Sequence, residues 1–509
     1  MQASSVELRL RVQLLLAYGA IAFTALIFGV FLATDRFFLA FLVGGTLAMA
    51  TLPFHAQIAY WLSIATFTSP LIVPFLPGAP NVWEAAGLLG WSGTVVMIML
   101  RRQHVEAGET IRRNKWMFIG LVMFVGVLLI TMQARGAGIM IFGSSMGGGR
   151  LYLQQLICAV FPLLFAMTTT DERTLFRLIS LQWILGLTFV FSDFAYTTGR
   201  FTELLYFLKP PYDAMNFEAQ AMSFGIRRFQ SLLFVGMSIS FLLLLYNPLR
   251  SFLGRRSVWI LPALGLALGV GLLSGHRMLY LLVPSVFLGV AVCQRFFNLR
   301  NQLIALIAGI PLLAVTYLFA DQLPVTAQRA ISFLPGIQID PRAYGDGQNT
   351  MLVRKALRKI GMDAIPDYLW IGRGFSRSVG VLDPRFQREH YQTATISYMV
   401  NQGIYMNGPI GLMVNTGVFG TLGFAVFLVG GTIAAIRIVR RLRRFGYEDR
   451  FALACGLVAS YWFPNLFRFC FIHGSAESAL MEFGLQAGML ILCERMLRNR
   501  EEQQLLEAA

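Results

Sequence analysis

The chain alternates long apolar runs with short polar segments along its whole length. A helix needs roughly 20 mostly apolar residues to cross a bilayer, because every backbone polar group must be satisfied within the helix. Runs of this length predict an all-α polytopic membrane protein with about fourteen transmembrane helices and one large, partly helical external loop. The expected spans lie at residues 12–34, 37–54, 57–77, 82–100, 116–134, 151–170, 178–198, 229–246, 258–275, 278–294, 303–320, 408–436, 451–470 and 475–493.

The composition agrees with this pattern. Of the 509 residues, 56% are hydrophobic and 13% are charged, and the mean hydropathy is +0.63. A soluble protein of several domains is excluded, because such proteins carry about 25% charged residues. Arg9 and Arg11 precede an apolar run that is too long for a signal-peptide core, so we expect the first span to stay attached. No metal site is expected from the cysteines, which lack ligand spacing and are predicted to be small core residues: Cys158, Cys293, Cys455, Cys470 and Cys493.

The formal net charge of +16 predicts an orientation in the membrane. Short cytoplasmic loops are enriched in Lys and Arg, which explains the charge better than a nucleic-acid surface does. With the N-terminus inside, the basic loops at 101–115, 247–257 and 437–450 fall on one face, and no nucleic-acid partner is expected. The outer face then carries three unusual segments: the loop 199–228, the hairpin SGHR at 274–277, and residues 321–405.

This organisation divides the chain into four parts. They are an N-terminal transmembrane bundle (1–198), core spans with outer arginines (199–320), an external loop (321–407) and C-terminal spans (408–509).

The loop 199–228 ends in two arginines. It breaks at KPPY and has amphipathic flanks, which predicts a helix lying on the outer surface. Arg227 and Arg228 stand immediately before the span 229–246. Paired arginines at a helix end often snorkel to the interface, but at an outer end they run against the inside bias. They therefore either anchor the helix or bind an anion.

His276 and Arg277 stand in a hairpin with almost no loop between two apolar runs. An ionisable group at this depth is costly unless it faces a cavity or a partner. The guanidinium offers a rigid donor fork that suits phosphate. Arg228 and Arg277 either converge on a pyrophosphate or pair with carboxylates such as those of Glu203 and Glu218. The anion site is the favoured interpretation.

Residues 321–405 form a connector that is too long to be idle. Within it, TMLVRKALRKIGM at 350–362 predicts a basic amphipathic helix with Leu352, Ala356 and Ile360 on its apolar face. Its basic residues are expected to turn elsewhere. Such a helix either docks on the membrane surface or holds an anionic lipid or a lipid-linked phosphate.

Further chemistry is expected in the segments around this helix. In IGRGFSRS at 371–378, Gly372 and Gly374 allow a close backbone approach around Arg373. His390, the one histidine within 321–405, is either a solvated loop residue or a base. A structural ion-pair cluster is expected at the turn between the last two spans, from Arg468, His473, Glu477 and Glu482.

The order of these parts resembles the O-antigen ligase and polymerase family, membrane glycosyltransferases that act on undecaprenyl-diphosphate-linked glycans. Its members carry an outer Arg before one span, an Arg in a serine-containing hairpin, and a long external loop. That loop ends in His-Asn, nine residues and Gly-x-x-Gly. The matching parts here, within roughly 220–436, are Arg228, Arg277 in SGHR, residues 321–405, and MNGPIGLMVNTGVFG at 406–420 with Asn407, Gly417 and Gly420.

The chain departs from the family pattern in two places. The family histidine falls on Met406, whose thioether cannot take a proton. If that histidine is a general base in relatives, the role is absent here, moves to a residue such as His390 or Glu389, or is unnecessary. After Arg228, SLLFVGM replaces the Gly and Asn-Pro that are often seen in the family.

The segment from Asn407 to Pro409 is expected to start its helix irregularly, beside a substrate cavity where non-helical backbone is tolerated. A plain helix N-terminus with Pro in its first turn is the alternative.

The resemblance implies an inverting, metal-independent glycosyltransferase of the bacterial inner membrane, with its active site on the periplasmic side and no cofactor. The implied donor is an undecaprenyl-diphosphate-linked glycan, and the acceptor is another glycan or lipid A core. The enzyme would be a polymerase of surface polysaccharide or an O-antigen ligase, in contact with membrane lipids and with a flippase or chain-length regulator as a candidate partner. The expected catalytic residues are Arg228, Arg277 and His390, and the expected substrate-binding residues are Arg227, His276, Arg373 and Asn407.

Two other classes stay open. A polysaccharide flippase or other transporter predicts charged residues near the bilayer midplane and pseudo-symmetric halves. A non-catalytic assembly partner would bind lipid-linked glycan without transferring it. Charge gathered at one face and a single large loop favour the glycosyltransferase.

Overall fold

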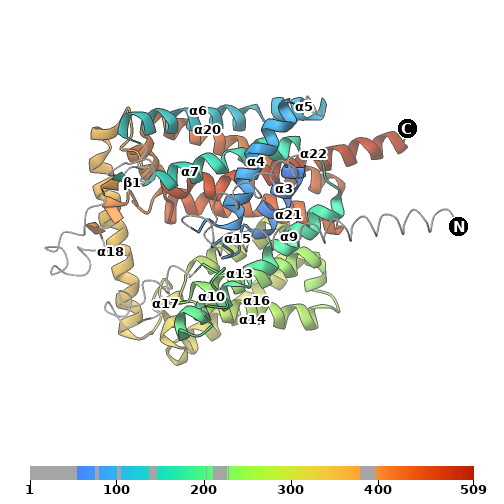
Figure 1. Ribbon diagram of the computed structural model, residues 1–509. Helices are drawn as coiled ribbons and strands as arrows, with labels where there is room; N and C mark the ends of the chain where they lie inside the picture. Colours follow the sequence, from blue (N-terminus) through green and yellow to red (C-terminus); the bar gives the residue numbers. More distant parts are fainter. Residues whose placement is uncertain are drawn as a thin grey trace.

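The described chain is built from helices, as the apolar runs predict (Figure 1). The computed structural model describes residues 54–508 except 75–78, 100–104, 137–145, 202, 210–225, 227, 376, 379–395, 398 and 447. The helices are α3 (His55–Thr66), α4 (Val82–Met99), α5 (Val105–Arg113), α6 (Lys115–Arg135), α7 (Gly149–Cys158), α8 (Val160–Met167), α9 (Glu172–Gly186), α10 (Phe189–Thr198), α13 (Gln230–Tyr246), α14 (Ser257–Leu273), α15 (Met278–Cys293), α16 (Leu299–Leu318), α17 (Val325–Ile331), α18 (Pro341–Ala364), α20 (Gly408–Phe445), α21 (Arg450–Phe467) and α22 (Ala479–Ala508).

Short elements complete the described structure. Two-residue strands β1 (Met146–Gly147) and β2 (Arg377–Ser378) pair antiparallel and join the segment before α7 to the external loop. Short 3-10 or π turns lie at Leu249–Phe252, Ala320–Gln322, Pro366–Tyr368, Arg468–Ile472 and Ala476–Ser478.

Several helices are long and apolar enough to cross a membrane, as expected of a membrane protein. In the described residues these are Lys115–Arg135, Gly149–Met167, Glu172–Thr198, Gly408–Phe445 and Ala476–Glu507. Four further helices, α4, α13, α14 and α15, are apolar but shorter. The expected span 12–34 and nearly all of 37–54 lie outside the described residues. The predicted count of about fourteen spans is therefore not confirmed.

One predicted span is shorter than expected, and the described part of the predicted surface helix is not helical. The run 57–77 stops being helical at Thr66, and Leu71 forms a bridge to Leu208. The backbone N–H of Lys209 donates to the carbonyl of Pro70 at 2.8 Å. Pro70 lacks an N–H and disfavours helix before it, which accounts for the early end. The described part of 199–209 forms turns rather than the predicted surface helix.

Helix α20 lies at the centre of the packing, and it meets α6 through small residues. A Cβ on Gly120 of α6 would collide with the backbone of Gly423 and Phe427, and one on Gly430 would collide with that of Met117. Within a membrane, helices gain little from apolar burial against each other, so close backbone approach at small residues drives their association. These glycines explain why the two helices lie side by side (Figure 1).

Helix α20 is broken at Gly417, which has φ +68° and ψ −174°. This region of backbone space is open essentially to glycine alone. The backbone groups freed by the break pair with the loop after α18: the N–H of Val418 donates to Leu369 O at 2.8 Å, and the N–H of Arg373 donates to Val414 O at 2.7 Å. The loop 369–374 thus completes the hydrogen bonding that the helix loses.

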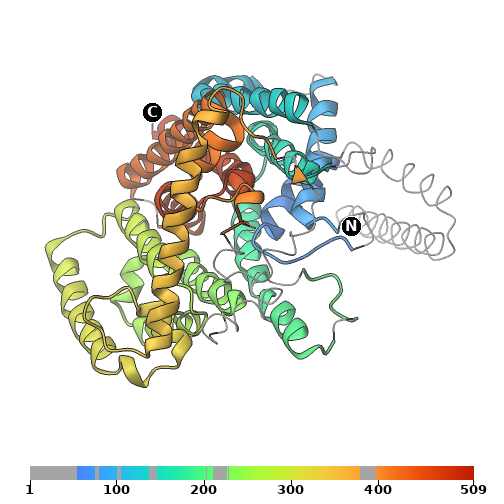
Figure 2. The same cartoon turned by 90° about the vertical axis from the view of Figure 1, so that its left-hand side faces the viewer.

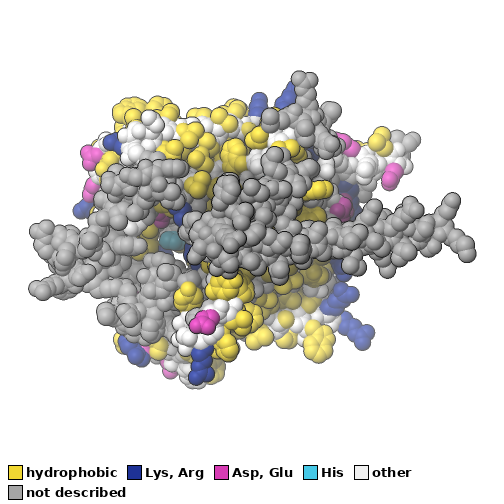
Figure 3. Space-filling model, in the orientation of Figure 1, with side chains coloured by type: hydrophobic (Ala, Val, Ile, Leu, Met, Phe, Trp, Pro, Cys, Tyr) yellow, Lys and Arg dark blue, Asp and Glu magenta, His cyan; other side chains and the backbone are white. Residues whose placement is uncertain are grey.

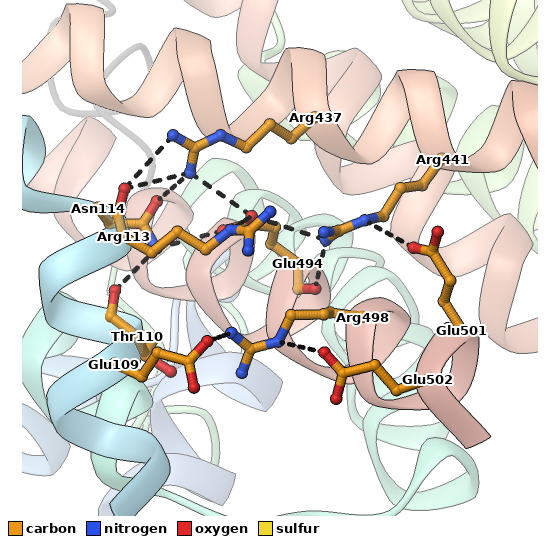
Figure 4. Close-up of polar contacts among 10 residues, drawn as sticks. All are labelled: Glu109, Thr110, Arg113, Asn114, Arg437, Arg441, Glu494, Arg498, Glu501 and Glu502. Carbon is orange, nitrogen blue, oxygen red and sulfur yellow. Dashed lines mark hydrogen bonds and ion pairs between the residues drawn. The ribbon is translucent and has the colours of Figure 1, made fainter. Parts of the chain in front are cut away.

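The end of α20 that carries the basic segment 437–444 forms ion pairs with carboxylates of neighbouring helices (Figure 4). Glu494 of α22 is buried and lies 2.8 Å from Arg113, 3.5 Å from Arg437 and 3.6 Å from Arg441. Arg441 also pairs with Glu501 at 3.2 Å. These ion pairs tie α5, α20 and α22 together on the face that the positive-inside rule assigns to the cytoplasm.

Helix α18 runs across the ends of the long helices instead of packing alongside them (Figures 1 and 2). Its buried residues are Ala343, Asp346, Gly347, Leu357 and Gly361. Leu352 is 60% exposed and Ile360 is 36% exposed, so the predicted apolar face does not pack on the bundle. The face that meets the bundle carries Leu357 together with small residues and one carboxylate.

Hydrophobic side chains cover much of the face shown in Figure 3 between the grey residues, and Lys and Arg gather mostly at its edges. This distribution fits a bundle whose sides meet lipid and whose ends meet water.

We predict that Gly417→Ala destabilises the protein by at least about 1–3 kcal/mol, because alanine is strained at this φ and ψ and its Cβ would press on the carbonyl of Trp370. Thermal unfolding in detergent measures the effect. Gly126→Ala in α6 is the control, since a Cβ there meets no atom within 4 Å and alanine is the better helix former. A melting temperature for Gly417→Ala equal to that of Gly126→Ala would contradict the proposed role of the break.

Candidate functional site

Five arginines gather where α18 crosses the helix ends, and they are named here the arginine cluster. Arg228 precedes α13, Arg277 precedes α15, and Arg329 lies on α17. Arg354 and Arg358 lie on α18, one turn apart. All five belong to the end of the molecule opposite the Glu494 ion pairs, because they surround the start of α15 and the segment before α20.

Asp346 of α18 holds two of these arginines. Arg228 Nη2 lies 3.1 Å from both carboxylate oxygens, and Arg329 Nε donates to Oδ2. Side-chain exposure is 24% for Arg228, 5% for Arg329 and 7% for Asp346. Burial alone would raise the pKa of Asp346, but the two guanidinium groups hold it below its usual range. The carboxylate is therefore ionised at neutral pH.

Arg329 is the most deeply enclosed member of the cluster. Its Nη1 donates to the carbonyl of Gly275 in the SGHR hairpin, and its Nη2 lies 3.5 Å from Thr350 Oγ1. Burial and then the charge of Arg228 lower its pKa to about 10, against the opposing effect of Asp346. Arg329 thus stays charged, and its bonds fix the hairpin against α17 and α18.

Arg277 is placed by a serine and a glycine. Its Nη2 donates to Ser332 Oγ at 2.7 Å, and that hydroxyl donates to the carbonyl of Arg329 at 2.8 Å. A Cβ on Gly347 would collide with Nη2, so Gly347 makes the room that the guanidinium occupies. Burial lowers the pKa of Arg277, and so does Arg228. The Nε of Arg277 is buried and has no hydrogen-bond partner.

Arg354 has no counter-charge in the described part of the chain. It makes no hydrogen bond or ion pair with a described residue, and its Nε is buried. Burial lowers its pKa, as do the positive charges of Arg277, Arg358 and Arg228. Neighbouring Arg358 donates to the carbonyl of Phe471 at 2.7 Å. Arg354 is therefore a cation held among cations.

The two ends of the molecule differ in how many carboxylates accompany their arginines. Around Glu494, arginines face several carboxylates, which include Glu501 and Glu109 (Figure 4). At the arginine cluster, the ion pairs between described residues come from one carboxylate, Asp346, for five guanidinium groups. Partly buried like charges are costly unless an opposite charge joins them. The arrangement has the chemistry of a binding site for a polyanion.

His473 lies beside this surplus charge, in the turn between α21 and α22. Its Nδ1 is buried without a hydrogen-bond partner. Burial and, after it, the positive charges of Arg354, Arg468 and His276 together lower its pKa to about 4. The imidazole is neutral at physiological pH, so it is able to accept a proton.

The ion pair expected near His473 is present between Arg468 and Glu482. Arg468 also donates to Asn465 Oδ1 at 2.8 Å, and Ser478 Oγ donates to the other oxygen of Glu482 at 2.7 Å. The polar groups of this ion pair join α21 to α22, which is the structural role that the sequence predicts.

The residues proposed from the sequence are distributed unevenly. Arg228, Arg277 and His276 come together at or beside the cluster. Arg373 donates to the carbonyls of Val400 and Asn401 at 2.7 and 2.8 Å, so its guanidinium holds the external loop. Arg227 and His390 lie outside the described residues.

Asn407 caps a helix. Its Oδ1 accepts from the N–H of Ile410 at 3.1 Å, and its Nδ2 donates to Cys470 O at 3.0 Å. Pro409 stands in the first turn, as in a plain helix N-terminus. The irregular start predicted at 407–409 is wrong, because the helix begins regularly at Gly408; positive φ values occur instead at Met406, with φ +50°, and at Gly417.

Two members of the site were not identified from the sequence. Arg329 stands in the short helix VTAQRAI and Asp346 in PRAYGDGQNT. Arg354 lies on the basic helix that the sequence predicts either to dock on the membrane surface or to hold an anionic lipid or a lipid-linked phosphate. A charged residue inside a short, mostly apolar helix such as α17 was the available sign, because such a residue needs a partner.

Compared with protein-family models and with curated proteins, the chain shows no match to either. The functional argument therefore rests on the residues of the site and their geometry.

We predict that His473→Gln reduces the loss of stability on acidification. The folded-state pKa of His473, about 4, lies below its usual value near 6.5, so the unfolded chain binds the extra proton between these two pH values. Stability must then fall as pH falls through this window, by at most roughly 3 kcal/mol from this group. Melting temperatures of wild type and variant from pH 7 to 4 test this; parallel curves would contradict it.

Proposed function

We propose that the protein transfers a glycan from an undecaprenyl-diphosphate-linked donor to a glycan acceptor, on the periplasmic side of a bacterial inner membrane. The observation that carries this proposal is Arg354, a partly buried cation that lies among other cations without a partner in the described residues. A diphosphate at the membrane surface supplies the missing negative charge. The lipid tail of such a donor would lie in the bilayer beside the helix ends.

The arginines would act most strongly as the bond to the diphosphate breaks. In a single displacement, the acceptor hydroxyl attacks the anomeric carbon while the bond from that carbon to the phosphate oxygen breaks. The leaving diphosphate gains one negative charge. Donors that are already fixed around a developing charge lower the barrier without reorganising, and the loss of one such donor typically costs about a hundredfold or more in rate. Guanidinium groups also bind phosphate oxygens in pairs of hydrogen bonds.

Asp346 and Arg329 would have a positioning role. Their ion pair and the bond from Arg329 to the Gly275 carbonyl hold α17, α18 and the SGHR hairpin together. This arrangement leaves the guanidinium group of Arg354 for the ligand.

His473 is the candidate base for the acceptor proton. It is neutral and presents an unpartnered ring nitrogen, and Arg354 lies close enough to lower its pKa. The Gly474 backbone packs against the N atom of Gly408, so this turn lies beside the segment that contains Met406. A histidine from the α21–α22 turn would thus supply the proton acceptor that Met406 cannot. The acceptor itself, a second lipid-linked glycan or lipid A core, decides between polymerase and ligase.

We predict that Arg354→Ala lowers glycan transfer about a hundredfold or more while it leaves the melting temperature unchanged or raises it, because it removes repulsion and no ion pair. A strain that lacks the gene is complemented with each variant at matched expression. The length of its cell-surface glycan is then read from a gel. Lys355→Ala is the matched control, since Lys355 is an exposed neighbour on the same helix.

Asp346→Ala is the structural contrast to Arg354→Ala in the same experiment. Breaking a buried pair costs about 3–5 kcal/mol, so this variant should lose stability and activity together. Long glycan chains in the Arg354→Ala strain would overturn the proposal and favour a transporter or scaffold.

A further inference from the structure

A groove lies between α15, α20 and α21, on the side of α20 away from the Glu494 ion pairs. Its volume is about 520 Å³. Its apolar lining includes Leu288 and Val292 of α15, Val439 of α20, and Phe463 and Phe467 of α21. Leu288 is 56% exposed and Phe467 is 47% exposed, so neither is covered by the rest of the chain. An apolar groove on the side of a membrane bundle is suited to a hydrocarbon chain.

Two arginines of the basic segment close one end of this groove. Arg440 and Arg443 line it and are exposed. Three residues apart on a helix, they share one face. Neither makes a hydrogen bond or ion pair with another residue in the part of the chain that the structure describes. Their neighbours Arg437 and Arg441 turn to the other face of α20 and pair with Glu494 (Figure 4). In the segment RIVRRLRR, Arg437 and Arg441 thus pair with a carboxylate inside the protein, whereas Arg440 and Arg443 face the groove.

The position along α20 places the arginines at the polar boundary. Arg440 lies 22 residues after Val418, the first residue beyond the break at Gly417, which is about 33 Å along the helix at 1.5 Å per residue. The hydrocarbon layer is about 30 Å thick. Charged side chains at this end therefore reach the headgroup level of the leaflet that the positive-inside rule assigns to the cytoplasm.

We propose that this groove binds one anionic glycerophospholipid of the cytoplasmic leaflet, with an acyl chain along Leu288, Val439 and Phe463 and its phosphate between Arg440 and Arg443. The occupant is chosen by charge: the groove is apolar along its length and carries two uncompensated cations at the headgroup end. This site is separate from the arginine cluster, which lies at the opposite end of α20, and it does not depend on the proposed glycosyl transfer.

Binding of phosphatidylglycerol and phosphatidylcholine to delipidated protein tests the proposal, measured by native mass spectrometry and by the shift of the melting temperature. Loss of two arginines at an anionic lipid surface should weaken phosphatidylglycerol binding about 30-fold, so R440Q/R443Q should lose the shift. The double variant R255Q/R256Q is the matched control, since it removes two exposed arginines elsewhere on the cytoplasmic face. It should bind phosphatidylglycerol as wild type does.

Leu288→Trp fills the groove and leaves both arginines in place, and it should also weaken phosphatidylglycerol binding. Equal binding by wild type and R440Q/R443Q would overturn the proposal. Equal losses in R440Q/R443Q and R255Q/R256Q would show general surface attraction, and an unchanged affinity in Leu288→Trp would show that no chain enters the groove. Either result also overturns it.

Discussion

The ion pairs of Asp346 hold together the end of the molecule that lies opposite the Glu494 ion pairs. One carboxylate on α18 binds Arg228 ahead of α13 and Arg329 on α17, and Arg329 in turn bonds the Gly275 carbonyl ahead of α15. Four segments that are distant in the sequence are thereby fixed at one point. Because the groups are nearly enclosed, each is costly to leave alone. The position of Arg277 and the course of α18 across the helix ends both follow from this arrangement.

The same end of the molecule is also left with excess positive charge. At the other end of α20, the arginines pair with carboxylates and so join neighbouring helices. This structural role is a sufficient reason for those arginines. Around Asp346 the described residues supply one carboxylate for five guanidinium groups, and Arg354 makes no ion pair with that carboxylate. Arg354 gains no ion pair from the described residues, and this is the reason for proposing an anionic ligand at this site.

The positions of the helices were largely predictable, because apolar runs of fixed length are what a bilayer demands. The break at Gly417 was not predictable. It depends on hydrogen bonds between the backbone groups that it frees and the loop 369–374, which lies about forty residues earlier in the sequence. Arg228 and Arg277 were proposed from the sequence because charge at an expected outer helix end is anomalous, and both lie near Asp346. Arg329 and Asp346 were missed because they lie on two different helices, and the sequence alone does not show that these helices meet. The face of α18 that packs on the bundle was not predicted, because glycine and aspartate make much of its contact beside Leu357.

The most direct test of the central claim, that this cluster is built to hold a diphosphate, is calorimetric titration of the purified protein with inorganic pyrophosphate. The account predicts saturable binding by wild type and Lys355→Ala, weakened about 10-fold or more in Arg354→Ala, since hydrogen bonds to charged groups contribute about 1.5–3 kcal/mol. Equal affinity in wild type and Arg354→Ala, or no binding by any of the three, would contradict it.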